Sequence, residues 1–74
     1  MPAQTEWEAK ASKLLKAELK RKGVTYAQLV ERLEAIGISE KEINVANKLS
    51  RGKFTAAFML QCLSAIGSTV LHLE

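Results

Sequence analysis

The sequence contains too few cysteine and histidine residues for most covalent or metal-dependent chemistry. Its one cysteine, Cys62, excludes an internal disulfide and a cysteine-based zinc site. Its one histidine, His72, is separated from Cys62 along the chain and is not expected to activate it. Acidic residues such as Glu31 and Glu34 are more simply explained as a solvated helix surface than as a catalytic pair. The sequence therefore predicts that the protein is not an enzyme and binds neither a metal nor a cofactor.

Long apolar runs and aromatic residues are also scarce. No apolar stretch approaches the roughly 20 residues that a membrane-spanning helix needs. Residues 1–6 lack the basic-then-apolar order of a signal peptide. We therefore expect a cytoplasmic protein with no membrane partner. Aromatic residues make up 5% of the chain, which disfavours single-stranded RNA as a ligand because its recognition depends on base stacking.

The composition that remains is typical of one small globular domain over residues 1–74. Hydrophobic residues make up 47% of the chain, which is too apolar for a disordered protein. A chain of 74 residues nevertheless buries only a limited core, so a partner subunit could add stability. The net charge of +3 mildly favours a polyanionic partner.

Capping signals divide the chain into four helices. Capping boxes, in which a Ser or Thr is followed three residues later by Glu or Gln, begin at Thr5, Thr25 and Ser39. Thr55 can cap a fourth helix without an acidic partner. A glycine follows each of the four segments, as is common where helices end. The predicted all-α fold therefore has helices at roughly 6–22, 26–36, 40–50 and 55–66.

Apolar residues recur at helical spacing and predict which side of each helix faces the core. In the first helix these residues are Trp7, Ala11, Leu14, Leu15 and Leu19. In the second they are Leu29, Val30, Leu33 and Ile36, and in the third they are Ile43, Ala46 and Leu49. The lysines of the first helix then face outward. We interpret Lys10, Lys13 and Lys16 as solvated residues. Residues 20–22 either contact a phosphate backbone or an anionic membrane surface, or interact with the helix dipole.

The fourth helix is apolar on nearly every side, which is difficult to bury in so small a domain. We therefore predict a homodimer. Residues 68–74, which partly alternate, form either a short strand paired with its copy or an extended tail packed on the core. The predicted dimer interface comprises Phe58, Met59, Cys62, Val70 and Leu71.

The third helix combines cationic and amide side chains on one stripe. Lys41, Asn44, Lys48 and Arg51 share this stripe, Asn47 lies at its edge, and Lys53 extends the positive charge. Such side chains can pair with guanine, adenine or phosphate. A stripe of this kind is more often a solvated face. Its place on the second helix of a short, glycine-linked pair favours a recognition helix.

The order of these features resembles the Cro/C1-type, phage-repressor-like helix-turn-helix family from Leu14 to Leu71. The matching segments are 15–25, 28–33, 47–53, where an Arg-Gly pair closes the third helix, and 58–67. The chain also resembles a family of small bacterial proteins with the same NKLSRGKFTAAF core. The sequence departs from the Cro/C1 pattern at Tyr26, where that family often has Gln, at Ser50, where it usually has Glu, and in a longer segment 33–47.

The resemblance implies a compact lambda-repressor-like domain of four helices, or five with a further short one. It places Asn44, Asn47 and Lys48 at base edges, and Arg51 and Lys53 near the DNA backbone. Tyr26 and Gln28, at the start of the second helix, are expected to contact DNA as well. The expected function is sequence-specific binding of double-stranded DNA by a homodimeric transcriptional regulator.

A helical protein-interaction module, such as an adaptor or an antitoxin, is the alternative. In that case the apolar fourth helix would bind a different protein, and DNA would not be bound. Glu31 and Glu34 in the second helix favour this alternative, because they would repel phosphate if they faced it.

Overall fold

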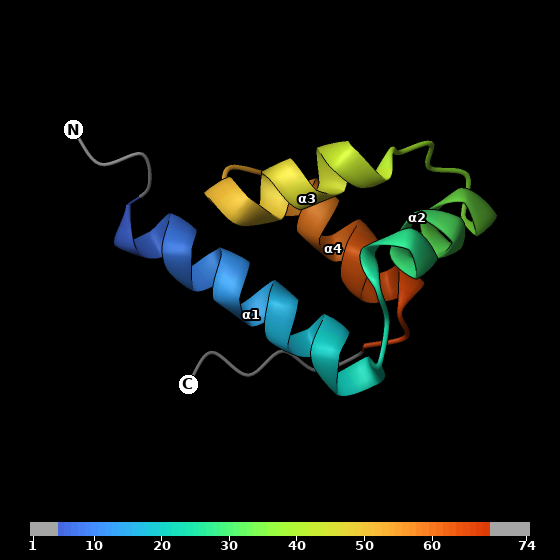
Figure 1. Cartoon of the computed structure of the whole chain (residues 1–74), viewed down its shortest axis with the longest axis horizontal. Coiled ribbons are helices and arrows are strands. Elements are labelled where there is room, and N and C mark those ends of the chain that lie inside the picture. The colour runs from blue at the N-terminus through green and yellow to red at the C-terminus, as the bar shows by residue number, and fades with distance from the viewer. Residues whose placement is uncertain (1–4, 69–74) are drawn as a thin grey trace.

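The computed structural model describes residues 5–68, and this part of the chain folds into four helices (Figure 1). Their bounds are Glu6–Lys22 for α1, Tyr26–Ala35 for α2, Glu42–Arg51 for α3 and Ala56–Ala65 for α4. Residues 5–68 contain no strand. The predicted all-α, four-helix fold is confirmed, and the predicted bounds of α1 are correct to the residue. The alternatives for residues 68–74 lie almost wholly outside the described residues.

Local capping chemistry fixes where α1 and α2 begin. At each start the threonine Oγ1 accepts a hydrogen bond from a backbone N–H three residues on, from Glu8 to Thr5 and from Gln28 to Thr25. The side chains of Glu8 and Gln28 in turn accept from the backbone N–H of the threonine, at 2.7 and 2.9 Å. Both predicted capping boxes therefore form, because each needs only residues within one turn.

The capping box predicted at Ser39 does not form. Helix α3 begins at Glu42, and its N-cap residue is Lys41, whose side chain makes no capping hydrogen bond. Residues 36–41 form a non-helical connection in which Ile38 packs against the core. The carboxylate of Glu40, which belongs to this connection, forms an ion pair with Lys48 of α3 at 2.7 Å. With these contacts in place, α3 begins two residues later than predicted.

Glycine supplies the left-handed backbone where α1 and α3 end. Gly23 has φ 68° and Gly52 has φ 69°, and each is the C-cap residue of its helix. Residues with a Cβ atom rarely adopt this conformation. Helices α2 and α4 end one residue earlier than predicted, with Ile36 and Ile66 as C-cap residues, and the predicted glycines follow with positive φ.

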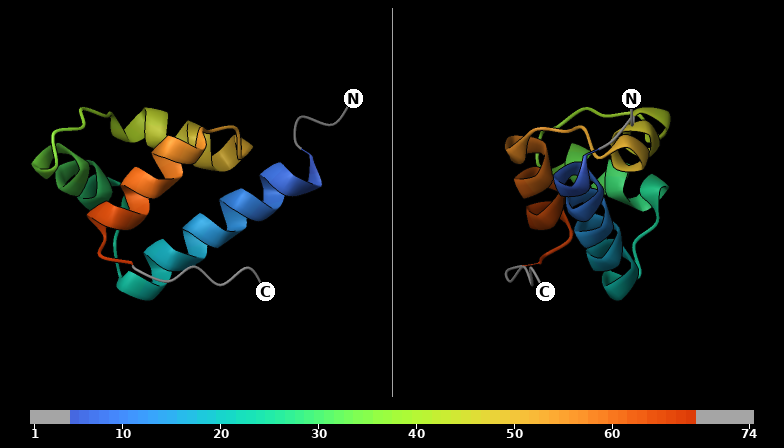
Figure 2. Two further views of the ribbon diagram at one scale, coloured as in Figure 1. Left: turned by 180° about the vertical axis from the view of Figure 1, so that it is seen from behind. Right: turned by 90° about the vertical axis from the view of Figure 1, so that its left-hand side faces the viewer.

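The four helices enclose one hydrophobic core. Helix α3 packs against α1 and α2, and α4 packs against α2 and, less extensively, α1. The view from behind in Figure 2 brings α4 to the front, with α2 and α1 on either side. The core residues are Leu15, Leu19, Val24, Leu29, Leu33, Val45, Leu49, Phe58, Cys62, Leu63 and Ile66.

Three residues predicted in the core are exposed instead. Trp7 is 76% exposed, and its ring lies 5.6 Å from Lys10 Nζ. Ile36 is exposed at the end of α2, and Ile43 is 64% exposed near the start of α3. Leu49 is buried as predicted and Ala46 is half-buried, but the second buried residue of α3 is Val45, one turn before Leu49, and not the predicted Ile43. The predicted and the observed residues both have helical spacing, so periodicity alone did not distinguish the inner side of α3 from its outer side.

Two buried polar contacts join segments that are distant in sequence. The Ser12 hydroxyl of α1 donates to the carbonyl of Leu49 in α3. The carboxylate of Glu18 is buried in α1, pairs with Arg21 at 2.7 Å, and accepts a hydrogen bond from Ser68 Oγ at 2.6 Å. These contacts attach α3 and the chain after α4 to α1.

No helix among residues 5–68 has the length and apolar character needed to cross a lipid bilayer.

Candidate nucleic-acid interface

The outer side of α3 combines amide, cationic and apolar side chains. It lies opposite the buried residues Val45 and Leu49, because each residue turns the helix by about 100°. The exposed residues on this side are Ile43, Asn44, Asn47, Ser50 and Arg51. Of the residues predicted to contact DNA, Asn44, Asn47 and Arg51 therefore lie together on one accessible surface. We call this set of five residues the outer face of α3.

Two further predicted cations lie at the ends of α3. Lys41 immediately precedes the helix and Lys53 follows its C-cap glycine, and both are exposed. Glu42, in the first turn, is the one acidic residue within the helix. The positive charge near the outer face therefore comes from Lys41, Arg51 and Lys53.

Lys48, predicted on the same stripe, is half-buried and makes contacts within the chain. Its Nζ atom is 2.7 Å from Glu40 Oε2 and 4.4 Å from the centre of the Phe58 ring. The ion pair neutralises its charge, and the aromatic ring covers part of its side chain. Lys48 is therefore a structural link between the α2–α3 connection and α4. The sequence did not indicate this role, because Glu40 and Phe58 belong to other elements.

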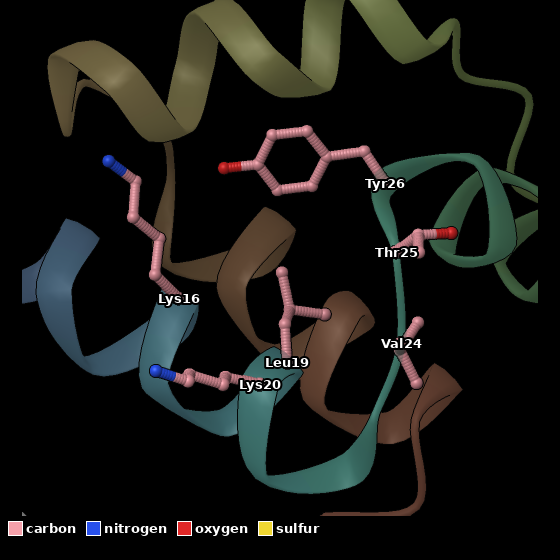
Figure 3. A pocket seen from close by; sticks show the side chains of 6 residues that line it. All are labelled: Lys16, Leu19, Lys20, Val24, Thr25 and Tyr26. Atoms are coloured by element: carbon pink, nitrogen blue, oxygen red, sulfur yellow. The ribbon is translucent and has the colours of Figure 1, made fainter.

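A groove lies between α1 and the start of α2, beside α3 (Figure 3). It has a volume of about 350 Å³, and Leu19 and Val24 provide apolar surface at its base. The hydroxyl of Tyr26 points across the groove to the side on which Lys16 lies. The lining residues are Lys16, Leu19, Lys20, Val24, Thr25 and Tyr26. Two lysines and a phenol thus line a groove with an apolar floor.

The two predicted DNA-contacting residues of α2 have different surroundings. Tyr26 is half-buried and packs against the core while its hydroxyl lines the groove. Gln28 is exposed, but its side-chain oxygen accepts from the Thr25 backbone N–H in the capping box. Lys16, predicted to be a solvated residue, lines the groove as well, and nothing in the order of residues indicates that it shares a groove with Tyr26.

The cations at the end of α1 are not equivalent. Arg21 pairs with Glu18, and this hydrogen-bonded ion pair raises the pKa of Arg21 above its ordinary value. Lys20 lines the groove, and Lys22 is exposed at the last position of the helix. Of the residues 20–22, Lys20 is thus the one that lines the same groove as the predicted contact residue Tyr26.

The predicted dimer residues of α4 occupy the core of a single chain instead. Phe58 and Cys62 are buried, and Met59 is half-buried against the same core. Burial raises the pKa of the Cys62 thiol to about 12, and the negative charge of Glu40 adds to the rise. Phe58 and Cys62 therefore have no surface to offer a second subunit. Val70 and Leu71 lie outside the described residues.

The surface that α4 does expose is uncharged. It consists of small residues around Leu60, which is 66% exposed. We call this surface the outer face of α4, and it comprises Ala56, Ala57, Leu60 and Ser64.

Among residues 5–68, no three His, Cys, Asp or Glu side chains are grouped so that they could hold a metal ion.

Comparison with known proteins identifies the family of the chain. No curated protein and no solved structure gives a significant match. One family model, described as a domain of unknown function (DUF6471), matches residues 7–71, which is most of the chain. The protein therefore belongs to the DUF6471 family.

Proposed function

We propose that the protein binds double-stranded DNA sequence-specifically, through the outer face of α3. The observation that carries the proposal is the exposure of Asn44, Asn47 and Arg51 on one side of a single helix. Asparagine can pair bidentately with adenine, and arginine with guanine or phosphate. The helix has ten residues, a length of about 15 Å, and the major groove of about 12 Å width admits an α-helix.

The groove between α1 and α2 supports the proposal because it adds cations beside α3. In a helix-turn-helix complex, residues near the start of the first motif helix contact the DNA backbone while the second helix enters the major groove. Lys16, Lys20 and the Tyr26 hydroxyl would donate to backbone phosphates in this position. Lys41 and Lys53 would do the same at the two ends of α3. Such contacts release counterions and make affinity depend on salt.

A homodimer acting as a transcriptional regulator is the second part of the proposal. The outer face of α4 is its contact surface, because an uncharged patch around Leu60 can pack against its own copy without burying a charge. Two copies of α3 would then read half-sites about one helical turn of DNA apart. Phe58 and Cys62 would contribute only by supporting α4 from inside.

The proposal is tested by fluorescence anisotropy of a mixed-sequence duplex at low and near-physiological salt. We expect affinity to fall steeply with salt, and Arg51→Ala to weaken binding about fivefold to thirtyfold. The matched control is Arg32→Ala, which removes the same charge from the exposed surface of α2. An equal loss in both variants would mean that net charge, and not the outer face of α3, controls binding. Absence of binding at low salt would refute DNA binding.

The protein-interaction module is the second candidate function, and exposed Leu60 is the observation that favours it. Under this alternative the outer face of α4 binds a different protein. A chain that binds no duplex at low salt and stays monomeric at high concentration, with Leu60 available to a partner, would support the adaptor function.

A further inference from the structure

Ile43 is an apolar residue that the fold leaves exposed. Its side chain is 64% exposed and does not belong to the core, whereas Val45, two residues on, is completely buried. Exposed isoleucines are common when isolated. Ile43 differs because it lies among groups suited to reading DNA bases.

Helical geometry places Ile43 beside the two amides of the outer face. Asn47 is four residues from Ile43 and Asn44 is three residues from Asn47, so the three side chains are neighbours on the helix surface. Ile43 is also the second residue of α3. The N-terminal residues of a recognition helix are those that contact base edges. The apolar group is thus at the end of the helix that would reach the bases.

The major groove offers one apolar group, the C5 methyl of thymine. The adenine paired with that thymine presents the acceptor and donor that an asparagine amide can engage. An isoleucine next to two asparagines therefore matches the chemistry of A·T pairs better than that of G·C pairs.

We infer that Ile43 is a specificity-determining residue that packs against a thymine C5 methyl, beside an adenine bound by Asn44 or Asn47. This inference rests on the proposed function and deepens it by naming the bases. It predicts that each half-site contains at least one A·T pair at which the methyl group itself contributes to affinity.

The experiment removes the methyl group from the DNA and the isoleucine from the protein separately. The full chain first selects its site from a pool of duplexes with a randomised centre. Each thymine of the selected site is then replaced by deoxyuracil, which lacks only the methyl group, and affinities are measured by anisotropy. We expect a loss of about threefold to tenfold at one position per half-site, typical of one buried methyl group or slightly more.

Ile43→Ala should lose a similar factor on the thymine site and should no longer respond to deoxyuracil at that position. Ile36→Ala is the matched control, because Ile36 is also an exposed isoleucine but lies at the end of α2. That variant should retain the full response. Circular dichroism should show unchanged helicity in both variants, since neither side chain is buried.

The failures are distinguishable. If no duplex is bound at low salt, the proposed function and this inference fail together. If a site is selected but contains no thymine, or Ile43→Ala responds to deoxyuracil as the parent does, the inference is wrong while DNA binding stands.

Discussion

Helices α3 and α4 have the same length of ten residues but expose opposite chemistry. The outer face of α3 carries two amides, an arginine, a serine and one isoleucine, whereas the outer face of α4 carries two alanines, a serine and a leucine. Both helices bury apolar residues on their inner sides, so the core does not account for this contrast. The difference shows that two surfaces of one small domain can differ in charge and polarity, and in our proposal they bind different partners, DNA at α3 and a second protein surface at α4.

The largest expected effect separates the inner side of α3 from its outer face. Leu49→Ala should lower the free energy of unfolding by about 2–5 kcal/mol, because it leaves a cavity at a fully buried position. Asn47→Ala, two residues earlier and exposed, should change it by less than about 0.5 kcal/mol. Urea denaturation followed by circular dichroism measures both. Similar values for the two variants would contradict the orientation of α3.

The inner side of α4 is tested by the titration of Cys62. Its thiol keeps its proton in the folded chain up to a pKa of about 12, whereas the ordinary value is 9.0. Stability is therefore unaffected by this group below pH 9. Between pH 9 and 12 the unfolded chain releases the proton first, so stability falls by up to about 1.4 kcal/mol per pH unit.

Cys62→Ala should flatten this alkaline fall, and the parent thiol should react slowly with a thiol reagent until the protein is unfolded. Urea denaturation of both proteins at several pH values measures the first effect. Because the two proteins share every other titratable group, the difference between their pH profiles isolates Cys62. An identical pH dependence in the variant would show that Cys62 is accessible in the folded state.

The outer face of α4 is tested by Leu60→Glu. The substitution places a charge at the centre of the proposed contact and should raise the dimer dissociation constant at least about tenfold, since an unpaired charge there would be desolvated. Light scattering after size exclusion measures the mass. Arg51→Ala is the control and should remain dimeric. A parent chain that is monomeric at high concentration would remove the dimer from the proposed function.

The smallest expected effect distinguishes two lysines near α3. Lys48→Ala should cost about 1 kcal/mol of stability, through loss of the Glu40 ion pair and the Phe58 contact. Lys53→Ala should leave stability unchanged and reduce the salt dependence of DNA binding by about one counterion. Denaturation and salt-dependent anisotropy separate the two outcomes. If the two effects were exchanged, Lys48 and not Lys53 would be the lysine that contacts DNA.

Local signals allowed much of the fold to be predicted from the sequence. The starts of α1 and α2 depend on hydrogen bonds within one turn, such as that between Thr5 and Glu8, and both were correct. The start of α3 was not, because the Glu40–Lys48 pair joins residues eight positions apart. The exposure of Trp7 and Ile43 could not be predicted either, since helical spacing does not specify which side of a helix another helix covers.

The candidate site divides in the same way. Asn44, Asn47 and Arg51 were predicted from their spacing and lie on the outer face of α3. The contribution of Lys16 to the groove depends on how α1 packs against the start of α2, which no local pattern encodes. The buried contact from Ser12 to Leu49, which holds α1 against α3, likewise spans 37 positions.

The ion pair between Glu40 and Lys48 has a consequence for any ligand of α3. It closes the connection between α2 and α3 onto the helix itself, and the Phe58 ring secures the lysine from the side of α4. The conformational entropy of that connection is therefore lost when the chain folds and not when a ligand arrives. A ligand that bound α3 would meet a helix whose position is already fixed, and its binding would not have to order this connection.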